Sequence, residues 1–300
     1  MNIIQETEET MEFKTGKTLL QLCKDNNLPI SEAMLLREME ISQLGREEIF
    51  NKMSHSWDIM KNSAKDALKG NLKSMGGLIG GEAVKLTGRR LSGEASACGQ
   101  IVSKAISYAM GVLEVNSSMG LIVAAPTAGS SGVIPGTFLA LQEEYGFTDE
   151  QMVMALFTAG AIGYLITFNA TIAGAEGGCQ AEVGSASAMA AAAVTELLGG
   201  SQEACLQAAT SAISNLLGLV CDPIGGLVEA PCQQRNAIGV SNAMICAEIA
   251  LSGIRNVVPF DEAVDVMFRV GKALPGELRE TALGGMAAAP SACSLCGLCN

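Results

Sequence analysis

The feature that most constrains the fold is a set of long runs of alanine, glycine and serine, of which residues 181–198 are the clearest example. Small side chains let neighbouring helices approach closely, whereas a half-buried strand needs alternating apolar and polar residues. We find no convincing run of that alternating kind and no repeat of fixed period. The sequence is 49% hydrophobic but only 4% aromatic and contains 34 glycines. We therefore predict an all-α fold whose helices pack through small residues.

The helical pattern continues along the chain without a polar linker, so we predict one domain over residues 1–300. Its ends are a loose N-terminal arm, about residues 1–16, and a cysteine-rich tail, residues 291–300. Ser31 and Asp261 are expected to cap helices, and Thr148 with Gln151 forms a predicted capping box. A glycine-rich loop is expected at 75–81, before a helix that begins at Glu82. The other predicted helices cover residues 18–25, 32–40, 46–69, 97–113, 148–168, 181–198, 202–217, 241–251 and 261–274.

Charge and hydropathy argue against two classes of partner. The chain has 19 Lys and Arg against 31 Asp and Glu, a net charge of -12, whereas binding to nucleic acid needs clustered basic charge. The apolar run at 153–168 is shorter than the roughly 20 residues that a membrane span needs. We therefore expect a buried helix there, and neither nucleic acid nor a membrane as a partner.

The ten cysteines have to be divided between structural and chemical roles. The N-terminal segment MNIIQETEETMEF is acidic and lacks the features of a secretory signal, so we expect a cytoplasmic, reducing location in which disulfides are disfavoured. Four cysteines lie in helix-like surroundings and are expected to be small core residues: Cys23, Cys98, Cys205 and Cys246.

Three other cysteines, Cys179, Cys221 and Cys232, lie instead among Gly, Pro, Gln and Asn. Turns of this kind let backbone amides approach thiolate sulfurs, which favours a metal cluster. The three are not joined by the CxxC spacing of a zinc finger or of an electron-transfer ferredoxin. Three thiolates on a four-iron cluster would leave one iron free to act as a Lewis acid for a hydroxyl or carboxylate oxygen.

A second unusual stretch, residues 119–136, has Pro126 and Pro135 on either side of a Gly- and Ser-rich loop. Such a loop at the start of a helix presents backbone N–H groups and hydroxyls to a carboxylate or phosphate. An ordinary Pro/Gly turn is the alternative. The candidate binding residues are Thr127, Ala128, Gly129, Ser130 and Ser131.

Three motifs, AGAEGGCQAEVGSASAM, GLVCDPIGGLVEAPC followed by QQRN, and NSSMGLIVAAPTAGSSGVIPG, resemble the signatures of the iron–sulfur-dependent L-serine dehydratases. The resemblance covers about residues 17–290 and is strongest to the α chain of the two-subunit form. It implies a helical catalytic domain that converts L-serine to pyruvate and ammonia with a [4Fe–4S] cluster held by Cys179, Cys221 and Cys232.

The same resemblance implies a partner, since single-chain members carry an N-terminal α/β segment that is absent here. A separate β chain with an ACT-like domain is expected to supply that part. Some relatives place a removable fourth cysteine ligand at the C-terminus. Here the candidates are Cys293, Cys296 and Cys299, of which Cys299 is nearest the end, and an unused or separately metal-binding tail is the alternative.

The sequence offers three candidates for the catalytic base. His55 is the only histidine, and the pKa range of histidine suits proton transfer near neutral pH. The family that the chain resembles tends to have a histidine in this helix. The alternative is an ordinary surface or core residue, which a lone histidine more often is. Lys85 is a competitor, with a solvated or paired helix residue as its alternative. Glu176 is another, although it could serve only to orient the cysteine loop.

Four further polar residues, Asn169, Gln233, Arg235 and Asn236, lie in motif positions and could bind the substrate carboxylate or the cluster sulfurs. Arg235 suits a carboxylate clamp, with a structural salt bridge as the alternative. Two rival functions are a pyridoxal-phosphate lyase, which would need an α/β fold, and a non-enzymatic cluster scaffold or redox sensor.

Overall fold

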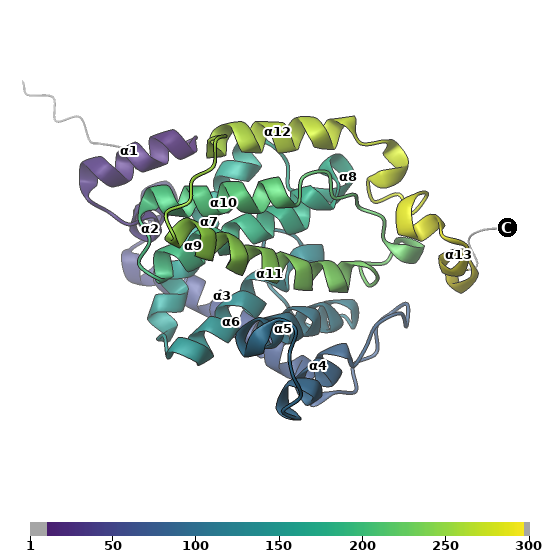
Figure 1. Ribbon diagram of the computed structural model, residues 1–300. Coiled ribbons are helices and arrows are strands. Elements are labelled where there is room, and N and C mark those ends of the chain that lie inside the picture. Colours follow the sequence, from purple (N-terminus) through teal and green to yellow (C-terminus); the bar gives the residue numbers. More distant parts are fainter. Residues whose placement is uncertain (1–10, 297–300) are drawn as a thin grey trace, which may run out of the picture.

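The computed structural model describes residues 11–296, and within that range the protein is built from helices (Figure 1). The only β feature in the described range is an isolated bridge between Cys221 and Arg279. The predicted all-α fold is therefore confirmed. The helices are α1 (Gly16–Asn26), α2 (Ile30–Ser42), α3 (Arg46–Asp66), α4 (Glu82–Leu91), α5 (Gly99–Ser117), α6 (Val133–Tyr145), α7 (Asp149–Asn169), α8 (Gly174–Gly177), α9 (Ser185–Leu197), α10 (Gln202–Asn215), α11 (Cys232–Leu251), α12 (Phe260–Ala273) and α13 (Pro290–Cys296).

The alanine-rich helix α9 lies at the centre of the fold. It packs against α7, α10, α11 and α6, and its residues from Ser185 to Thr195 are all buried. Small side chains make this close packing possible. At the α5–α6 contact, for example, a Cβ added to Gly136 would lie 2.8 Å from the carbonyl oxygen of Ala105. The small-residue runs that predicted an all-α fold thus form its core.

Helix α7 contains the long apolar run. Its start is the predicted capping box, because the Thr148 side chain accepts from the N–H of Gln151 and the Gln151 side chain accepts from the N–H of Thr148. The helix is long and apolar enough to cross a membrane, but 67% of its most apolar stretch is buried inside the protein, as in the core helix of a packed domain.

Two predicted caps are wrong, and in both cases a carboxylate pairs with the start of a helix that is distant in sequence. Helix α2 begins at Ile30 rather than after Ser31, and Glu196 accepts from the N–H groups of both residues. Asp261 lies inside the first turn of α12 and bonds instead to the start of α1, accepting from the N–H of Gly16 at 2.6 Å, next to the local cap Thr15.

Two further differences concern cysteines. Cys23, Cys205 and Cys246 are buried as predicted, but Cys98 is exposed, so the core prediction for Cys98 is wrong. Helix α11 begins at Cys232 rather than at Ser241, because the turn-rich segment ends at Pro231 and helical backbone follows at once. The longer α11 carries Cys232, Arg235 and Asn236 on its first two turns.

Candidate functional site

Cys179 lies where α8 meets a π-helical turn, η3 (Gln180–Gly184). Such wide turns are rare and occur frequently at functional sites. The buried side chain of Gln180 anchors this one: its Nε2 donates to the carbonyl of Met267, and its Oε1 accepts from the N–H of Gly218, both at 2.8 Å. The backbone N–H of Gln180 donates to the carbonyl of Leu219 at 2.9 Å. These bonds hold Cys179 against the loop that leads to Cys221.

Cys221 lies on the loop between α10 and α11, where it pairs with the C-terminal segment. Its N–H donates to the carbonyl of Leu278 at 2.9 Å, and its carbonyl accepts from the N–H of Glu280 at 2.7 Å. The neighbouring Asp222 accepts from the N–H of Met286 at 2.6 Å. The segment just before α13 therefore lies beside the cysteine loop, at the end of the molecule where α13 is seen in Figure 1.

Cys232 is the first residue of α11, and Arg235 on the next turn connects it to the Cys221 loop. The buried guanidinium donates from Nη1 to the carbonyl of Val220 at 2.8 Å, and its Nη2 lies 2.6 Å from Oδ1 of Asp222. The salt bridge that the sequence left as the alternative for Arg235 is thus formed. It joins the two segments that carry Cys221 and Cys232.

The three thiols are buried and interact electrostatically with one another. Burial, reinforced by Glu182, raises the pKa of Cys179 and of Cys232 to about 12 and raises the pKa of Cys221 further. The guanidinium of Arg235 lowers the pKa of Cys179 and of Cys232, but by less than burial raises it. A thiolate in such surroundings needs a cation nearby, and a bound metal supplies one. Three thiols brought together from segments far apart in sequence are thus suited to a metal group.

Within residues 11–296, no group of three or more His, Cys, Asp or Glu side chains is placed to hold a single metal ion. An iron–sulfur cluster, in which sulfide bridges several irons, occupies a larger space than one ion. The absence of a side chain at Gly174 lets the Cys221 thiol lie close to the backbone of α8, because a Cβ added there would lie 3.1 Å from Sγ of Cys221. The donor set of three cysteine thiols is of the kind that iron–sulfur clusters use.

The loop at 127–131 lies against the cysteine site, and Asn236 attaches it. Nδ2 of Asn236 donates to the carbonyls of Gly129, at 2.7 Å, and Cys232, at 2.9 Å. Its Oδ1 accepts from the N–H of Gly132 at 3.0 Å. One side chain thus connects the Gly- and Ser-rich loop to the helix that carries a cysteine. Within the loop, Ala128–Ser130 form a short 3-10 helix, and Ser130 and Ser131 are buried.

Glu182 is a site residue that the sequence analysis missed. Its carboxylate is buried between the two unusual stretches, accepting from Oγ1 of Thr127 at 2.9 Å and from Sγ of Cys221 at 3.5 Å. Burial raises the pKa of Glu182, against the lowering effect of the Thr127 hydrogen bond. The one sequence signal was its place three residues after Cys179. The neighbouring candidate Glu176 is exposed on α8.

The glycine-rich loop at 75–81 is fixed by a second missed carboxylate, Glu229, three residues before Cys232. Glu229 is buried and accepts from Oγ of Ser74 at 2.8 Å and from the N–H groups of Gly76, at 2.6 Å, and Leu78, at 2.9 Å. On the other side of Cys232, Nε2 of Gln233 donates to Oε1 of Glu114 at 3.1 Å. The loop therefore forms a wall next to the start of α11.

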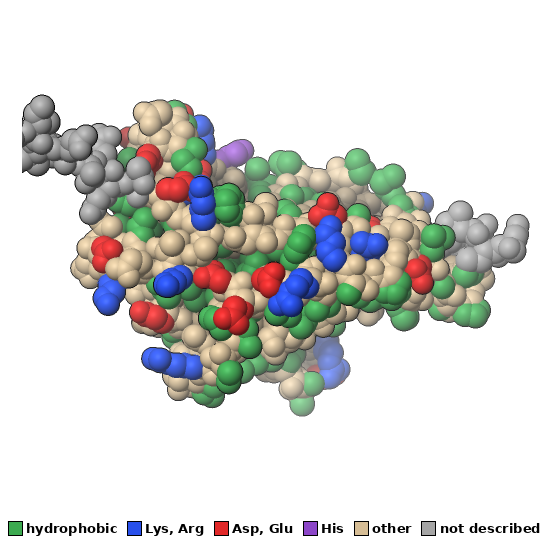
Figure 2. Space-filling view, turned by 90° about the horizontal axis from the view of Figure 1, so that it is seen from above, with side chains coloured by type: hydrophobic (Ala, Val, Ile, Leu, Met, Phe, Trp, Pro, Cys, Tyr) green, Lys and Arg blue, Asp and Glu red, His purple; other side chains and the backbone are tan. Residues whose placement is uncertain are grey.

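Several predicted site residues lie elsewhere. His55 is exposed on α3 (purple in Figure 2), and the side chain of Lys85 is 77% exposed on α4, with its Nζ 3.9 Å from Glu82. No hydrogen bond or ion pair of the described residues joins either to the three cysteines. Asn169, at the end of α7, donates to the carbonyls of Lys14 and Leu165. Cys299 lies outside the described residues.

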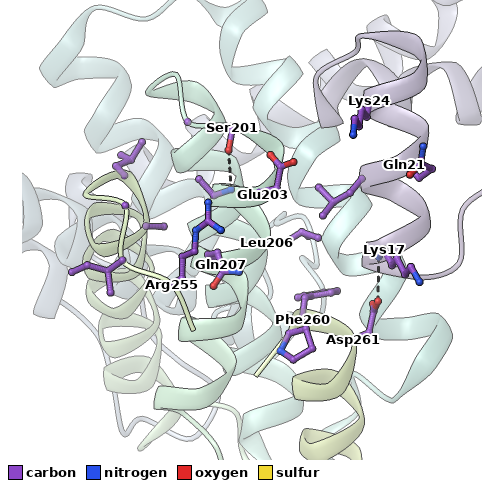
Figure 3. Close-up of a pocket in the computed structure, with 18 of the residues that line it drawn as sticks. Lys17, Gln21, Lys24, Ser201, Glu203, Leu206, Gln207, Arg255, Phe260 and Asp261 are labelled. Atoms are coloured by element: carbon purple, nitrogen blue, oxygen red, sulfur yellow. Dashed lines mark hydrogen bonds between the residues drawn. The ribbon is translucent and has the colours of Figure 1, made fainter. Parts of the chain in front are cut away.

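A separate groove of about 920 Å³ lies between α1, α10 and the start of α12 (Figure 3). Side chains of both charges line it, among them Lys17, Lys24, Glu203, Arg255 and Asp261. It contains none of the predicted site residues and no cysteine. The cysteine site is therefore the better candidate for chemistry.

Comparison with known proteins shows which family the chain matches. The family described as serine dehydratase alpha chain matches residues 25–287. A probable L-serine dehydratase alpha chain from Bacillus subtilis is 48% identical over 93% of this chain and 92% of its own length. The L-serine dehydratase alpha chain of Peptoniphilus asaccharolyticus is 46% identical over 92% of this chain and 94% of its own. An L-serine dehydratase from Streptomyces coelicolor is 36% identical over 95% of this chain but only 63% of its own length.

Proposed function

The chain belongs to the serine dehydratase alpha chain family, and from this premise we propose that it is a lyase that converts L-serine to pyruvate and ammonia. The observation that carries the proposal is the convergence of three buried thiols, from Cys179, Cys221 and Cys232, beside a loop suited to a carboxylate. We propose that these thiols hold a [4Fe–4S] cluster.

When bound, the cluster supplies a Lewis acid that weakens the bond between the substrate's β-carbon and its hydroxyl group. Groups of the chain itself bind the substrate carboxylate and exclude water. The loop at 127–131 supplies N–H donors for the substrate carboxylate and for negative charge that develops next to it. Arg235 stays a prediction for this role, because its guanidinium is held by Asp222 and by the carbonyl of Val220. The burial of the site excludes water, so these interactions act in a medium of low dielectric. The released aminoacrylate hydrolyses without further help.

For the α-proton, His55 and Lys85 stay predictions, since both are exposed and neither contacts the cysteine site within the described residues. Replacing each residue separately with alanine tests the assignment. Loss of a general base lowers kcat by about 10²–10⁴-fold. A variant that keeps its turnover is removed as a candidate.

We further propose that a second chain completes the enzyme. The family is described as an alpha chain, and the Streptomyces relative extends well beyond the matched region. A β chain, with the ACT-like fold that the sequence resemblance implies, would supply that part. A tail cysteine, Cys299 being nearest the end, is proposed as a fourth cluster ligand. A cytoplasmic location would supply the reducing conditions that the free thiols need.

The test is pyruvate formation from L-serine by protein purified without oxygen together with its partner chain. Wild-type protein and the control Cys98→Ser, which changes an exposed cysteine, should be active. Cys221→Ser should be inactive. Equal turnover by Cys221→Ser and wild type would reject the proposal. The pyridoxal-phosphate alternative has no support in the all-α fold of the described residues.

A further inference from the structure

Glu182 places its carboxyl group between the loop at 127–131 and Cys221. Its Oε1 accepts from Thr127 at 2.9 Å, and its Oε2 accepts from the Cys221 thiol at 3.5 Å. Glycines on both sides leave room for the carboxylate. A Cβ added to Gly129 would lie 3.0 Å from Oε1, and one added to Gly174 would collide with Oε2.

This carboxylate has no cationic partner among the described residues. Its residue is only 9% exposed, yet no Lys, Arg or His within residues 11–296 forms an ion pair with it, and the nearby Arg235 pairs with Asp222 instead. A buried charge without a partner is costly. The one described donor to Oε2 is the weak S–H group of Cys221 at 3.5 Å.

We propose that Glu182 binds the ammonium group of the amino-acid substrate and so selects amino acids over acids that lack this group. The inference rests on the proposed function. An ammonium group carries three N–H donors and a positive charge, which match the two oxygens of Glu182. Thr127 bonds this carboxylate to the loop proposed for the substrate carboxylate. The partners of the two charged groups thus lie side by side, as those groups do on one α-carbon.

The test compares two ligands that differ only in the ammonium group, L-alanine and propionate. Neither has a β-hydroxyl, so neither is turned over. Dissociation constants are measured by ligand-observed NMR on the anaerobic complex with its partner chain, for wild type, Glu182→Gln and the matched control Glu176→Gln, which changes the exposed glutamate on α8. Iron content and circular dichroism show that each variant is folded and loaded.

Wild type and Glu176→Gln should bind L-alanine more tightly than propionate. Glu182→Gln should weaken L-alanine binding by about tenfold or more, the size expected for a charged hydrogen bond, and leave propionate binding unchanged within about twofold. Thr127→Val, which removes the donor to Oε1, should weaken L-alanine binding selectively but less. If Glu182→Gln does not load with iron, the inference is tested by Thr127→Val alone: selective weakening of L-alanine binding supports it, and unchanged binding of L-alanine contradicts it.

The inference would be overturned if the loaded Glu182→Gln protein bound L-alanine and propionate more weakly by the same factor. It would also be overturned if this variant bound both ligands as wild type does and yet lost turnover. These outcomes are distinct from failure of the proposed function. In that case the wild-type complex itself contains no iron or forms no pyruvate.

Discussion

The side chain of Asn236 donates to the carbonyl of Gly129 at 2.7 Å and so joins the start of α11 to the Gly- and Ser-rich loop. Asn236→Ala should release this loop, raise KM for L-serine and lower the free energy of unfolding by roughly 1–3 kcal/mol, because buried backbone groups lose their partners. Steady-state kinetics and urea unfolding measure the two effects. Gln234→Ala, an exposed neighbour on α11, is the control. An Asn236→Ala protein with wild-type KM would mean that the loop does not bind substrate.

The buried pair of Arg235 and Asp222 should behave as a unit, since Nη2 and Oδ1 are 2.6 Å apart. Arg235→Gln leaves an uncompensated buried carboxylate and should cost about 3–5 kcal/mol of stability. The double variant with Asp222→Asn should recover part of that loss. Chemical unfolding of the two single variants and the double variant gives the coupling energy. Strictly additive losses would show that the pair does not hold the two cysteine segments together.

Gly174→Ala should impair loading of the cluster more than it impairs folding. The added methyl group would reach 3.1 Å from Sγ of Cys221 and collide with Glu182, and such overpacking costs about 1–3 kcal/mol. Iron content after anaerobic reconstitution is the readout. Gly88→Ala is the control, because a Cβ at that position in α4 meets no atom within 4 Å. Full iron content in Gly174→Ala would show that this glycine is not needed to make room for the cluster.

Stability at low pH should depend on Asp149. Hydrogen bonds from Lys61 and then Gln142 lower the pKa of this carboxyl from 3.8 to about 2. Because the folded-state pKa lies below the unfolded one, the stabilisation is complete above pH 3.8 and is lost as the pH falls to about 2. The side chain is half exposed, so solvent screening limits the effect to at most about 1 kcal/mol.

Urea unfolding of the full chain between roughly pH 2 and pH 6 checks this expectation, because that range spans both pKa values of Asp149. Asp149→Asn should be less stable than wild type near pH 6, and the difference should shrink toward pH 2. Asp265→Asn, which removes an exposed ion pair on α12, should change little at any pH. A difference for Asp149→Asn that does not vary with pH would contradict the assignment.

Local patterns predicted local structure well. The capping box at Thr148 and Gln151 depends on residues only three apart, and it forms as predicted. The predicted turn-rich setting of the three cysteines holds at Cys221, whereas Cys179 and Cys232 lie at the starts of helices. The missed features depend on contacts between distant residues. Asp261 reads as a cap for α12 but bonds to Gly16, 245 residues away.

Glu182 shows the same limit in the candidate site. It lies within a run that reads as ordinary helix, and its partner Thr127 is 55 residues away. Its place three residues after Cys179 is the one local signal, and it does not show that the carboxylate is turned into the site. The approximate positions of most helices could thus be predicted from periodicity, although α11 begins nine residues earlier than predicted, at Cys232 rather than Ser241. The buried carboxylates that position the loops around the cysteines required the packed structure.

The central claim is that Cys179, Cys221 and Cys232 together hold one iron–sulfur cluster. The most direct measurement is the iron and acid-labile sulfide content, per chain, of protein purified without oxygen together with its partner. We predict about four irons and four sulfides in wild type and in Cys98→Ser, as a [4Fe–4S] cluster requires, and loss of both when any of the three cysteines is changed to serine. Wild-type protein that forms pyruvate without containing iron or sulfide would contradict the claim.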